Sequence, residues 1–198
     1  MDADLAEILL EAQARGLVGS REISWHIAHA ERYIACVPRD ARCLDLGSGG
    51  GLPGLPVAVA RPDVVLQLVD ARDRSAQWLR LAVARLGLGS RVQVTHSRAE
   101  ALVASGLTDI DVVLARGFGP PADLAECAAA LLRVGGRLVV SAVGDGSEWP
   151  ADGLARLGFA APVITQDHYG AMVVAVLQSR CPPGYPRRPK ARSDAPLW

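Results

Sequence analysis

From Arg42 onward, short runs rich in β-branched residues alternate with stretches of Ala, Leu and Arg at helical spacing. The runs that predict strands are "RCLDLG", "VVLQLVD", "RVQVTHS", "IDVVLAR" and "GRLVVSAV", and the stretches that predict helices are residues 53–60, 73–87, 98–105 and 122–133. Parallel neighbours need a long crossover connection, and a helix is the usual one. The alternation therefore predicts an α/β fold, with helices on both faces of a parallel sheet.

The carboxyl-terminal part of the chain departs from this alternation. A short helix is expected near residues 150–157, and the runs "PVITQDH" and "GAMVVAVLQS" then follow with only a few residues between them. A gap this short permits only an antiparallel pair. Five parallel strands with a terminal antiparallel hairpin resemble the seven-stranded, Rossmann-like sheet of class I S-adenosylmethionine-dependent methyltransferases better than the all-parallel sheet of a dehydrogenase domain.

The 198 residues suffice for one substantial core rather than two full-sized domains. Two helical patterns precede the first strand: one runs from Leu5 to Gly16, and the other from Ile23 to Val37 behind an expected cap at Ser20. We therefore expect a helical extension at residues 1–40, a methyltransferase domain at 41–180 and a basic, Pro/Arg-rich tail at 181–198. No uncharged apolar stretch is long enough to span a bilayer and the amino terminus is acidic, which predicts a cytoplasmic protein without a membrane partner.

The stretch "CLDLGSGGGLPGLP", residues 43–56, places five glycines behind the first strand. Glycine lets the backbone turn tightly and lets a ligand approach it directly. Ligands in open α/β sheets bind beyond the carboxyl ends of the strands, where helix amides point outward. The loop therefore predicts a seat for a nucleoside-type cofactor whose contacts include backbone amides, against the alternative that the glycines serve only as a turn.

Two cofactors fit this loop. The spacing Gly49-x-Gly51-x-x-Gly54 also matches the dinucleotide pattern, and Asp70, at the end of the second strand, can accept hydrogen bonds from the ribose hydroxyls of either cofactor. Asp45 ahead of the loop, the G-x-G-x-G form of its first glycines and the terminal hairpin together favour S-adenosyl-L-methionine. A nicotinamide dehydrogenase is the alternative.

The chain resembles the bacterial 16S rRNA guanine-N7 methyltransferases, the glucose-inhibited division protein B family, in the segments "LDLGSGGGLPGLPVAVARPD", "LQLVDARDRSAQWL", "HSRAEAL", "LARGFGPP" and "CPPGYPRRP". The resemblance implies that Gly47 and Leu52 contact the cofactor and that Ala99 and Glu100 flank its adenine. It also places Arg116 near the methionine end and the target base. The expected cofactor set is Asp45, Gly47, Ser48, Gly49, Gly51, Leu52, Asp70, Ala71, Arg98, Ala99, Glu100 and Arg116.

Arg116 is the candidate catalytic residue. A guanidinium there can pair with the cofactor's carboxylate or with an RNA phosphate, and a plain surface arginine is the alternative. Guanine N7 presents a lone pair and carries no proton, so methyl transfer to it requires positioning and electrostatics rather than a general base. The four histidines show no metal spacing and are expected at helix surfaces or strand ends: His26, His29, His96 and His168.

The expected partner is 16S rRNA or the 30S ribosomal subunit, bound by a monomer that does not act on DNA. Basic residues expected to meet the RNA are Arg72, Arg74, Arg98 and Arg116, together with the tail, which from Arg180 onward carries five basic residues and one acidic residue. A flipped base could stack on an aromatic ring, for which the candidates are Phe118 and Tyr169. Packing is the alternative for both rings.

Several features of the family pattern are missing. The segment "HIAHAERY" lacks an Arg-His pair, "VVSAVGDG" lacks a Lys-Gly pair, Arg74-Ser75 stands for a Lys-Arg pair, and Ala115 stands for a serine. These departures fall on the substrate side more than on the cofactor side. They keep two alternatives open: a diverged paralogue that methylates a small molecule, and a non-catalytic protein that binds the cofactor or RNA.

Overall fold

The computed structural model describes residues 3–198, which form two compact units. The first unit comprises the described residues up to Arg98 together with Leu114–Arg116, and the second comprises Ala99–Val113 and Gly117–Trp198. None of the helices in the described residues is long and apolar enough to cross a membrane.

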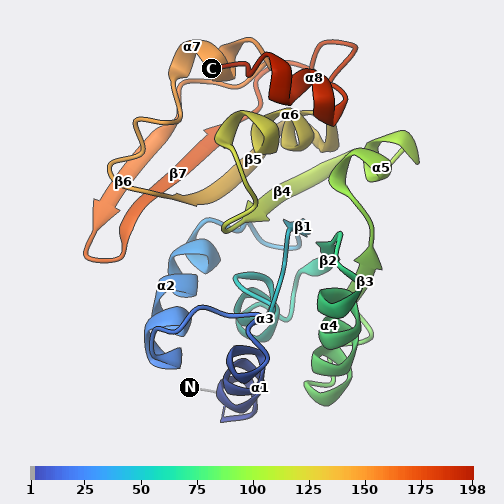
Figure 1. The fold of residues 1–198 in the computed structure, drawn as a ribbon, viewed down its shortest axis with the longest axis vertical. Helices are drawn as coiled ribbons and strands as arrows, with labels where there is room; N and C mark the ends of the chain where they lie inside the picture. The colour runs from blue at the N-terminus through green and yellow to red at the C-terminus, as the bar shows by residue number, and fades with distance from the viewer. Residues whose placement is uncertain (1–2) are drawn as a thin grey trace. The chain divides into compact units, whose positions relative to one another are not determined.

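The first unit contains three adjacent parallel strands and the helices around them (Figure 1). The register pairs Leu46 with Val69 and Asp70 with His96, so the strands end at the same edge of the sheet. This edge carries the glycine loop. The elements of this unit are α1 (Ala3–Ala14), α2 (Ile23–Ala35), β1 (Arg42–Leu46), α3 (Gly54–Ala60), β2 (Val65–Asp70), α4 (Asp73–Arg85) and β3 (Val92–His96).

Burial in the first unit follows the sequence patterns. Strand β1 is buried over its last four residues, as a parallel strand covered on both faces requires. Helix α4 is amphipathic and turns Ala76, Leu79 and Val83 inward, while it packs on β2 and β3. Helix α3 packs on β2, and both α1 and α2 pack on α3.

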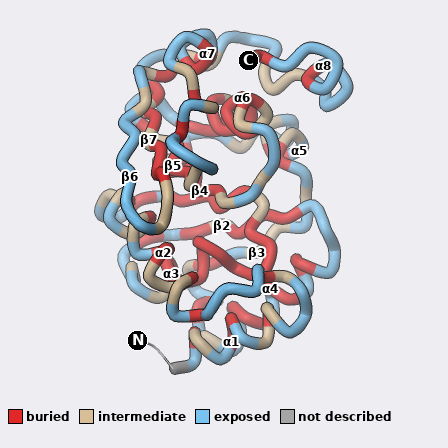
Figure 2. The backbone as a smooth tube through the Cα atoms, turned by 60° about the vertical axis from the view of Figure 1, so that its left-hand side comes forward, coloured by how far each residue is buried: buried red, intermediate tan, exposed pale blue. Residues whose placement is uncertain are grey.

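The second unit is built around an antiparallel arrangement of β5, β7 and β6. Strand β5 pairs with β7, and β7 pairs with β6, which is exposed along its whole length (Figure 2). The elements are α5 (Ala99–Ala104), the first part of β4 (Ile110–Ala115), α6 (Pro121–Leu131), β5 (Leu132–Ala142), α7 (Ala151–Ala155), β6 (Val163–Asp167), β7 (Gly170–Val176) and α8 (Pro189–Asp194).

The described strands follow the order β3-β2-β1-β4-β5-β7-β6 in a seven-stranded sheet. The expected terminal hairpin is therefore present. The expected helices are present with ends that differ by one or two residues, and two differences concern the carboxyl-terminal part of the chain. Helix α6 ends at Leu131 and β5 begins at once at Leu132, because Leu132 already has an extended backbone (ψ 143°). The tail also contains helix α8, which its Pro/Arg-rich composition did not predict.

The expected cap at Ser20 is wrong. Helix α2 begins at Ile23, its N-cap residue is Glu22, and the amide of His26 donates the first helical hydrogen bond to the carbonyl of Glu22 (3.2 Å). The preceding loop is held in a non-helical path because the side-chain amide of Gln13 donates to the carbonyls of Gly19 and Arg21. The helix starts at Ile23, as its apolar pattern predicted, but its N-cap lies two residues beyond Ser20.

Candidate cofactor and active site

The glycine loop is joined to strand β2 by hydrogen bonds. The amides of Gly47 and Ser48 donate to the carbonyl of Val69 (2.8 and 3.0 Å), and the amide of Val69 donates to the Ser48 hydroxyl (3.0 Å). That hydroxyl donates in turn to the carbonyl of Asp45 (2.8 Å). Gly47, Gly49 and Gly51 all have positive φ angles (73°, 56° and 105°), a region that favours glycine. Local geometry thus explains these three glycines.

Two other glycines are required by packing. A Cβ on Gly54 would lie 2.3 Å from Leu68 Cδ2 and 2.5 Å from Asp45 Oδ2. A Cβ on Gly50 would lie 2.5 Å from Val18 Cγ2 and 2.9 Å from the Leu17 carbonyl oxygen. At both positions the loop backbone therefore lies too close to neighbouring segments of the protein to leave room for a side chain.

The loop amides expected to bind a ligand already have acceptors within the chain. Besides Gly47 and Ser48, the Gly49 amide donates to Asp70 Oδ2 (2.8 Å) and the Gly51 amide donates to the Ser48 carbonyl (2.7 Å). Ser48, Gly49, Gly51 and Leu52 are buried, whereas Gly47 is half-buried. The loop is thus a turn that its own hydrogen bonds hold in place. The polar groups that a ligand could meet there belong to the side chains of Asp45 and Asp70 rather than to these four amides.

Asp70 lies at the end of β2, and its carboxylate is almost fully buried. Asp70 Oδ1 accepts from the Arg72 amide (2.9 Å) and from Arg72 Nε (3.2 Å), and Oδ2 accepts from the Gly49 amide. Burial opposes ionisation, but the hydrogen bonds from Arg72 and Gly49 outweigh it and lower the pKa of Asp70. The Arg72 side chain is 68% exposed and can move away, which a ribose hydroxyl requires in order to reach this carboxylate.

Asp45 is fully buried at the end of β1. Its Oδ2 accepts from the Gly54 amide (3.0 Å), whereas Oδ1 has no hydrogen-bond partner among the described residues. Desolvation raises the pKa of Asp45 to about 7, although the nearby Ser48 side chain, the Gly54 hydrogen bond and the charge of Arg116 oppose this rise. The first unit therefore contains a buried carboxyl group that changes charge near neutral pH.

Arg116 follows β4 and is half-buried in the first unit. Its Nη1 lies 3.2 Å from His26 Nδ1, and desolvation lowers the pKa of its guanidinium against the opposing influence of Tyr33 and Asp45. Tyr33 Oη donates to the carbonyl of Ala115 (3.0 Å), so helix α2 contacts two successive residues at the end of β4. Sequence reasoning missed this partnership, because 90 residues separate His26 from Arg116.

The remaining candidates occupy different environments. Ala71 and Arg98 are exposed in the first unit, whereas Ala99 is buried and Glu100 is half-buried in the second. The structure thus brings together Asp45, the loop, Asp70 and Arg116 within one unit, and Ala99 and Glu100 belong to the other.

The other aromatic, histidine and arginine candidates differ in their exposure. Phe118 and Tyr169 are half-buried, and His96 and His168 are exposed. Arg74 donates to the carbonyl of Arg15, and His29 is buried beside Trp25, with ring centroids 5.1 Å apart.

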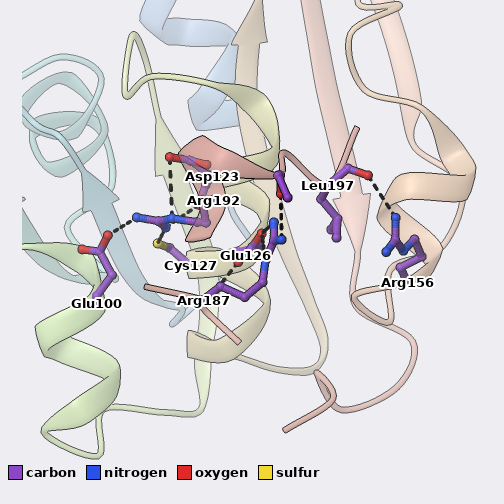
Figure 3. Close-up of polar contacts among 9 residues, drawn as sticks. Glu100, Asp123, Glu126, Cys127, Arg156, Arg187, Arg192 and Leu197 are labelled. Carbon is purple, nitrogen blue, oxygen red and sulfur yellow. Dashed lines mark hydrogen bonds and ion pairs between the residues drawn. The ribbon is translucent and has the colours of Figure 1, made fainter. Parts of the chain in front are cut away.

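Two arginines of the tail are held by carboxylates of the second unit (Figure 3). Arg187 donates from its backbone amide and from Nε to the two oxygens of Glu126 (both 2.9 Å), and Glu126 is fully buried on α6. Arg192, on α8, pairs with Glu100, contacts Asp123 Oδ2 (3.6 Å) and donates to Cys127 Sγ (3.2 Å). These two charges are committed within the protein, which reduces the charge that the tail offers to RNA.

Comparison with known proteins identifies the family. The family described as rRNA small subunit methyltransferase G (GidB) matches residues 4–144. The chain belongs to this family. Ribosomal RNA small subunit methyltransferase G of Salinispora arenicola is 38% identical over 178 residues, which cover 83% of this chain and 73% of that protein. The protein of the same name from Salinispora tropica is 39% identical over 180 residues, 84% of this chain and 73% of that protein.

Solved structures confirm the fold of this methyltransferase G family member. The SAM-dependent O-methyltransferase of Thermotoga maritima superposes with a TM-score of 0.68 at 14% identity, over 88% of this chain and 72% of that one. The O-methyltransferase of Bacillus cereus in complex with SAH gives a TM-score of 0.68 at 17% identity, over 90% of this chain and 92% of that one. The class I sheet, with five parallel strands and an antiparallel hairpin, is therefore confirmed.

S-adenosyl-L-methionine is the cofactor of the methyltransferase G family, and the described residues fit it. The cofactor's amino-acid end carries an ammonium and a carboxylate. Asp45 supplies a buried carboxyl oxygen without a donor, and Arg116 supplies a half-buried guanidinium. Complementary charges for both ends of that group are therefore present in the first unit.

Proposed function

We propose that the chain transfers a methyl group from S-adenosyl-L-methionine to N7 of a guanine in 16S ribosomal RNA. The observation that carries this proposal is the family match over residues 4–144, which includes the glycine loop and the strand ends that bear Asp45 and Arg116. The acceptor would be 16S rRNA or the 30S subunit, met in the cytoplasm by a monomer.

The cofactor, when bound, supplies an electrophilic methyl group on a sulfonium. Asp45 Oδ1 would accept from its ammonium, and Asp70 would accept from a ribose hydroxyl once Arg72 has moved aside. Arg116 would bind the cofactor's carboxylate or a phosphate of the RNA.

The chemistry of guanine N7 matches the side chains of the first unit. Because N7 offers a lone pair and loses no proton, the reaction needs alignment rather than a base. His26, the buried imidazole beside Arg116, has both ring nitrogens in contact with other groups of the chain, so neither nitrogen faces the acceptor as a general base. A site that holds a guanidinium in place is therefore sufficient for this acceptor.

The test is methyl transfer from labelled cofactor to 30S subunits that lack the modification. We expect label in a guanine of 16S rRNA, and a loss of about a hundredfold in Arg116→Ala. Arg80→Ala is the matched control, because Arg80 is an exposed arginine on α4 that has no role in the proposed site. Wild-type protein that binds the cofactor but labels no RNA would contradict the proposal.

A small-molecule acceptor is the second candidate, and the ion pairs of Arg187 and Arg192 favour it, because they reduce the charge available to RNA. The exposed pair Arg188 and Lys190 separates the two candidates. Arg188→Gln with Lys190→Gln should weaken RNA methylation and flatten its salt dependence if the tail binds phosphates. Unchanged activity and salt dependence would favour the small molecule.

A further inference from the structure

His26 is a buried histidine on α2, 5% exposed, and both of its ring nitrogens have a defined neighbour. Nε2 lies 3.1 Å from the carbonyl oxygen of Gly19, and Nδ1 lies 3.2 Å from Arg116 Nη1. A carbonyl oxygen can only accept and a guanidinium can only donate. The contacts therefore define one tautomer: Nε2 carries the hydrogen, Nδ1 accepts, and the imidazole is neutral.

The surroundings of His26 support the neutral form. The charged groups that face it are Arg116 from the end of β4 and Arg21 from the loop before α2, and both are positive. Burial first, and then these two charges, lower the pKa of His26 from its ordinary value of 6.5, although the Gly19 hydrogen bond opposes the shift. Helix α3, which packs against α2, contains no charged residue, and α1 reaches this loop through the neutral amide of Gln13.

Helix α2 holds the end of β4 through two side chains, His26 and Tyr33. Tyr33, two turns further along α2, donates to the carbonyl of Ala115 and fixes the backbone. His26 contacts the next residue at its side chain. The other end of the imidazole is tied to Gly19, whose carbonyl also accepts from Gln13. Backbone and side chain are therefore both held by one helix, and that helix is anchored to the loop before it.

A neutral partner has a consequence that a carboxylate would not have. Arg187 and Arg192 are paired with carboxylates, so their charge is neutralised within the protein. The hydrogen-bond partner that orients Arg116 is uncharged, so this contact leaves the positive charge of the guanidinium for an anion, although Asp45 interacts with it electrostatically. A long arginine side chain needs such orientation, because it otherwise loses rotamer freedom when it binds.

We propose that His26 is a positioning residue for methyl transfer, and that its neutral Nε2–H tautomer holds the guanidinium of Arg116 toward the anion that Arg116 binds. The proposal rests on the function proposed above for Arg116. Protonation at Nδ1 would replace the acceptor with a donor and place a second positive charge beside the guanidinium. Positioning is therefore lost as the pH falls through the pKa of His26, below its ordinary range.

Two substitutions separate the contacts of the imidazole. His26→Asn places an amide oxygen near the position of Nδ1 and keeps the acceptor for Arg116. His26→Gln places an amide nitrogen near the position of Nε2 and keeps only the donor for Gly19. We expect the rate of methyl transfer to 30S subunits to fall about a hundredfold in His26→Gln, because Arg116 is then misplaced. In His26→Asn the rate should stay within about fivefold of wild type.

A structural role alone would give a different pattern. It predicts equal losses in both variants, and losses that persist when Arg116 is already Ala. The proposal predicts that His26→Gln has no further effect in the Arg116→Ala background. Equal activities of His26→Asn and His26→Gln, with both proteins folded by thermal unfolding, would overturn it.

A readout independent of activity is the nitrogen NMR signal of the His26 ring. We expect an unprotonated Nδ1 in wild-type protein at neutral pH, and a higher pKa of His26 in Arg116→Ala, because a neighbouring positive charge is removed. A pKa unchanged by Arg116→Ala would refute the contact. If this signal behaves as expected while no RNA is labelled, the proposed function fails and the positioning of Arg116 stands.

Discussion

Asp45 combines complete burial, one unpartnered carboxyl oxygen and a pKa near neutrality. A carboxyl group that is neutral in its resting state and ionised beside a cation can respond to a ligand's ammonium by releasing its proton. The charge of this site therefore depends on pH around pH 7.

Stability should show this titration. The pKa of Asp45 rises from 3.8 to about 7 on folding, so the folded state binds more protons between these values and the free energy of unfolding falls as the pH rises through them. The shift corresponds to at most about 4 kcal/mol. Asp45→Asn should remove this part of the pH dependence in urea unfolding measured at pH 5 and pH 8. The same difference between the two pH values in both proteins would contradict the raised pKa.

The affinity for the cofactor should also depend on the ionisation of Asp45, but it should rise with pH where the free energy of unfolding falls. An ammonium binds the ionised form of Asp45, so the affinity for S-adenosylhomocysteine should increase as the pH rises toward the pKa of about 7 and level off above it. Calorimetry between pH 5.5 and 8.5 measures this. Asp45→Asn should bind more weakly and without this pH dependence, and a variant that keeps the wild-type profile would exclude Asp45 as the titrating group.

Gly54 provides a second test at the residue scale. A methyl group there would lie within 2.5 Å of the Asp45 carboxylate and of Leu68, so Gly54→Ala should lower the free energy of unfolding by about 1–3 kcal/mol. Gly89→Ala is the matched control, because a Cβ at Gly89 meets nothing within 4 Å. Urea unfolding should separate the two variants, and equal stabilities would show that the loop can relax.

At the scale of elements, the tail docks on α6 through a buried carboxylate. Glu126 is fully buried and its counter-charge is supplied by Arg187, 61 residues away (Figure 3). Removing one partner of a buried pair leaves an uncompensated charge, which costs about 3–5 kcal/mol. The tail segment is thus part of the second unit's structure as well as a basic surface.

Arg187→Ala should lower the free energy of unfolding by about 3 kcal/mol or more, because the Glu126 charge stays buried. Arg188→Ala changes the neighbouring, exposed arginine and should have little effect. In the Glu126→Gln background the Arg187→Ala loss should shrink. A loss that is the same in both backgrounds would mean that Arg187 acts through some other contact.

At the scale of the whole molecule, a formal net charge of zero leaves RNA affinity to local groups rather than to an overall field. Deleting residues 181–198 removes Arg187 and Arg192, and also Trp198, which donates to the Glu148 carbonyl and covers Gly153. We expect this deletion to lower the melting temperature by more than any single tail substitution. An unchanged melting temperature would show that the tail is not structural.

The sequence by itself determined the alternation of strands and helices, the terminal hairpin and the place of the glycine loop. These features follow from hydrophobic periodicity, from loop length and from the steric freedom of glycine, which act over a few residues. Asp45, Asp70 and Arg116 were also predictable as strand-end residues, because parallel strands end at one edge.

Only the tertiary structure decided how those side chains are engaged. It placed His26 on Arg116, Arg72 on Asp70 and Arg187 on Glu126, and it directed the loop amides to acceptors of the chain itself. It also placed the N-cap of α2 at Glu22 instead of Ser20. Most of these pairs join segments far apart in the chain, and the packing of elements brings them together. A polar group bonds to whichever partner packing leaves within reach, and no local pattern encodes that choice.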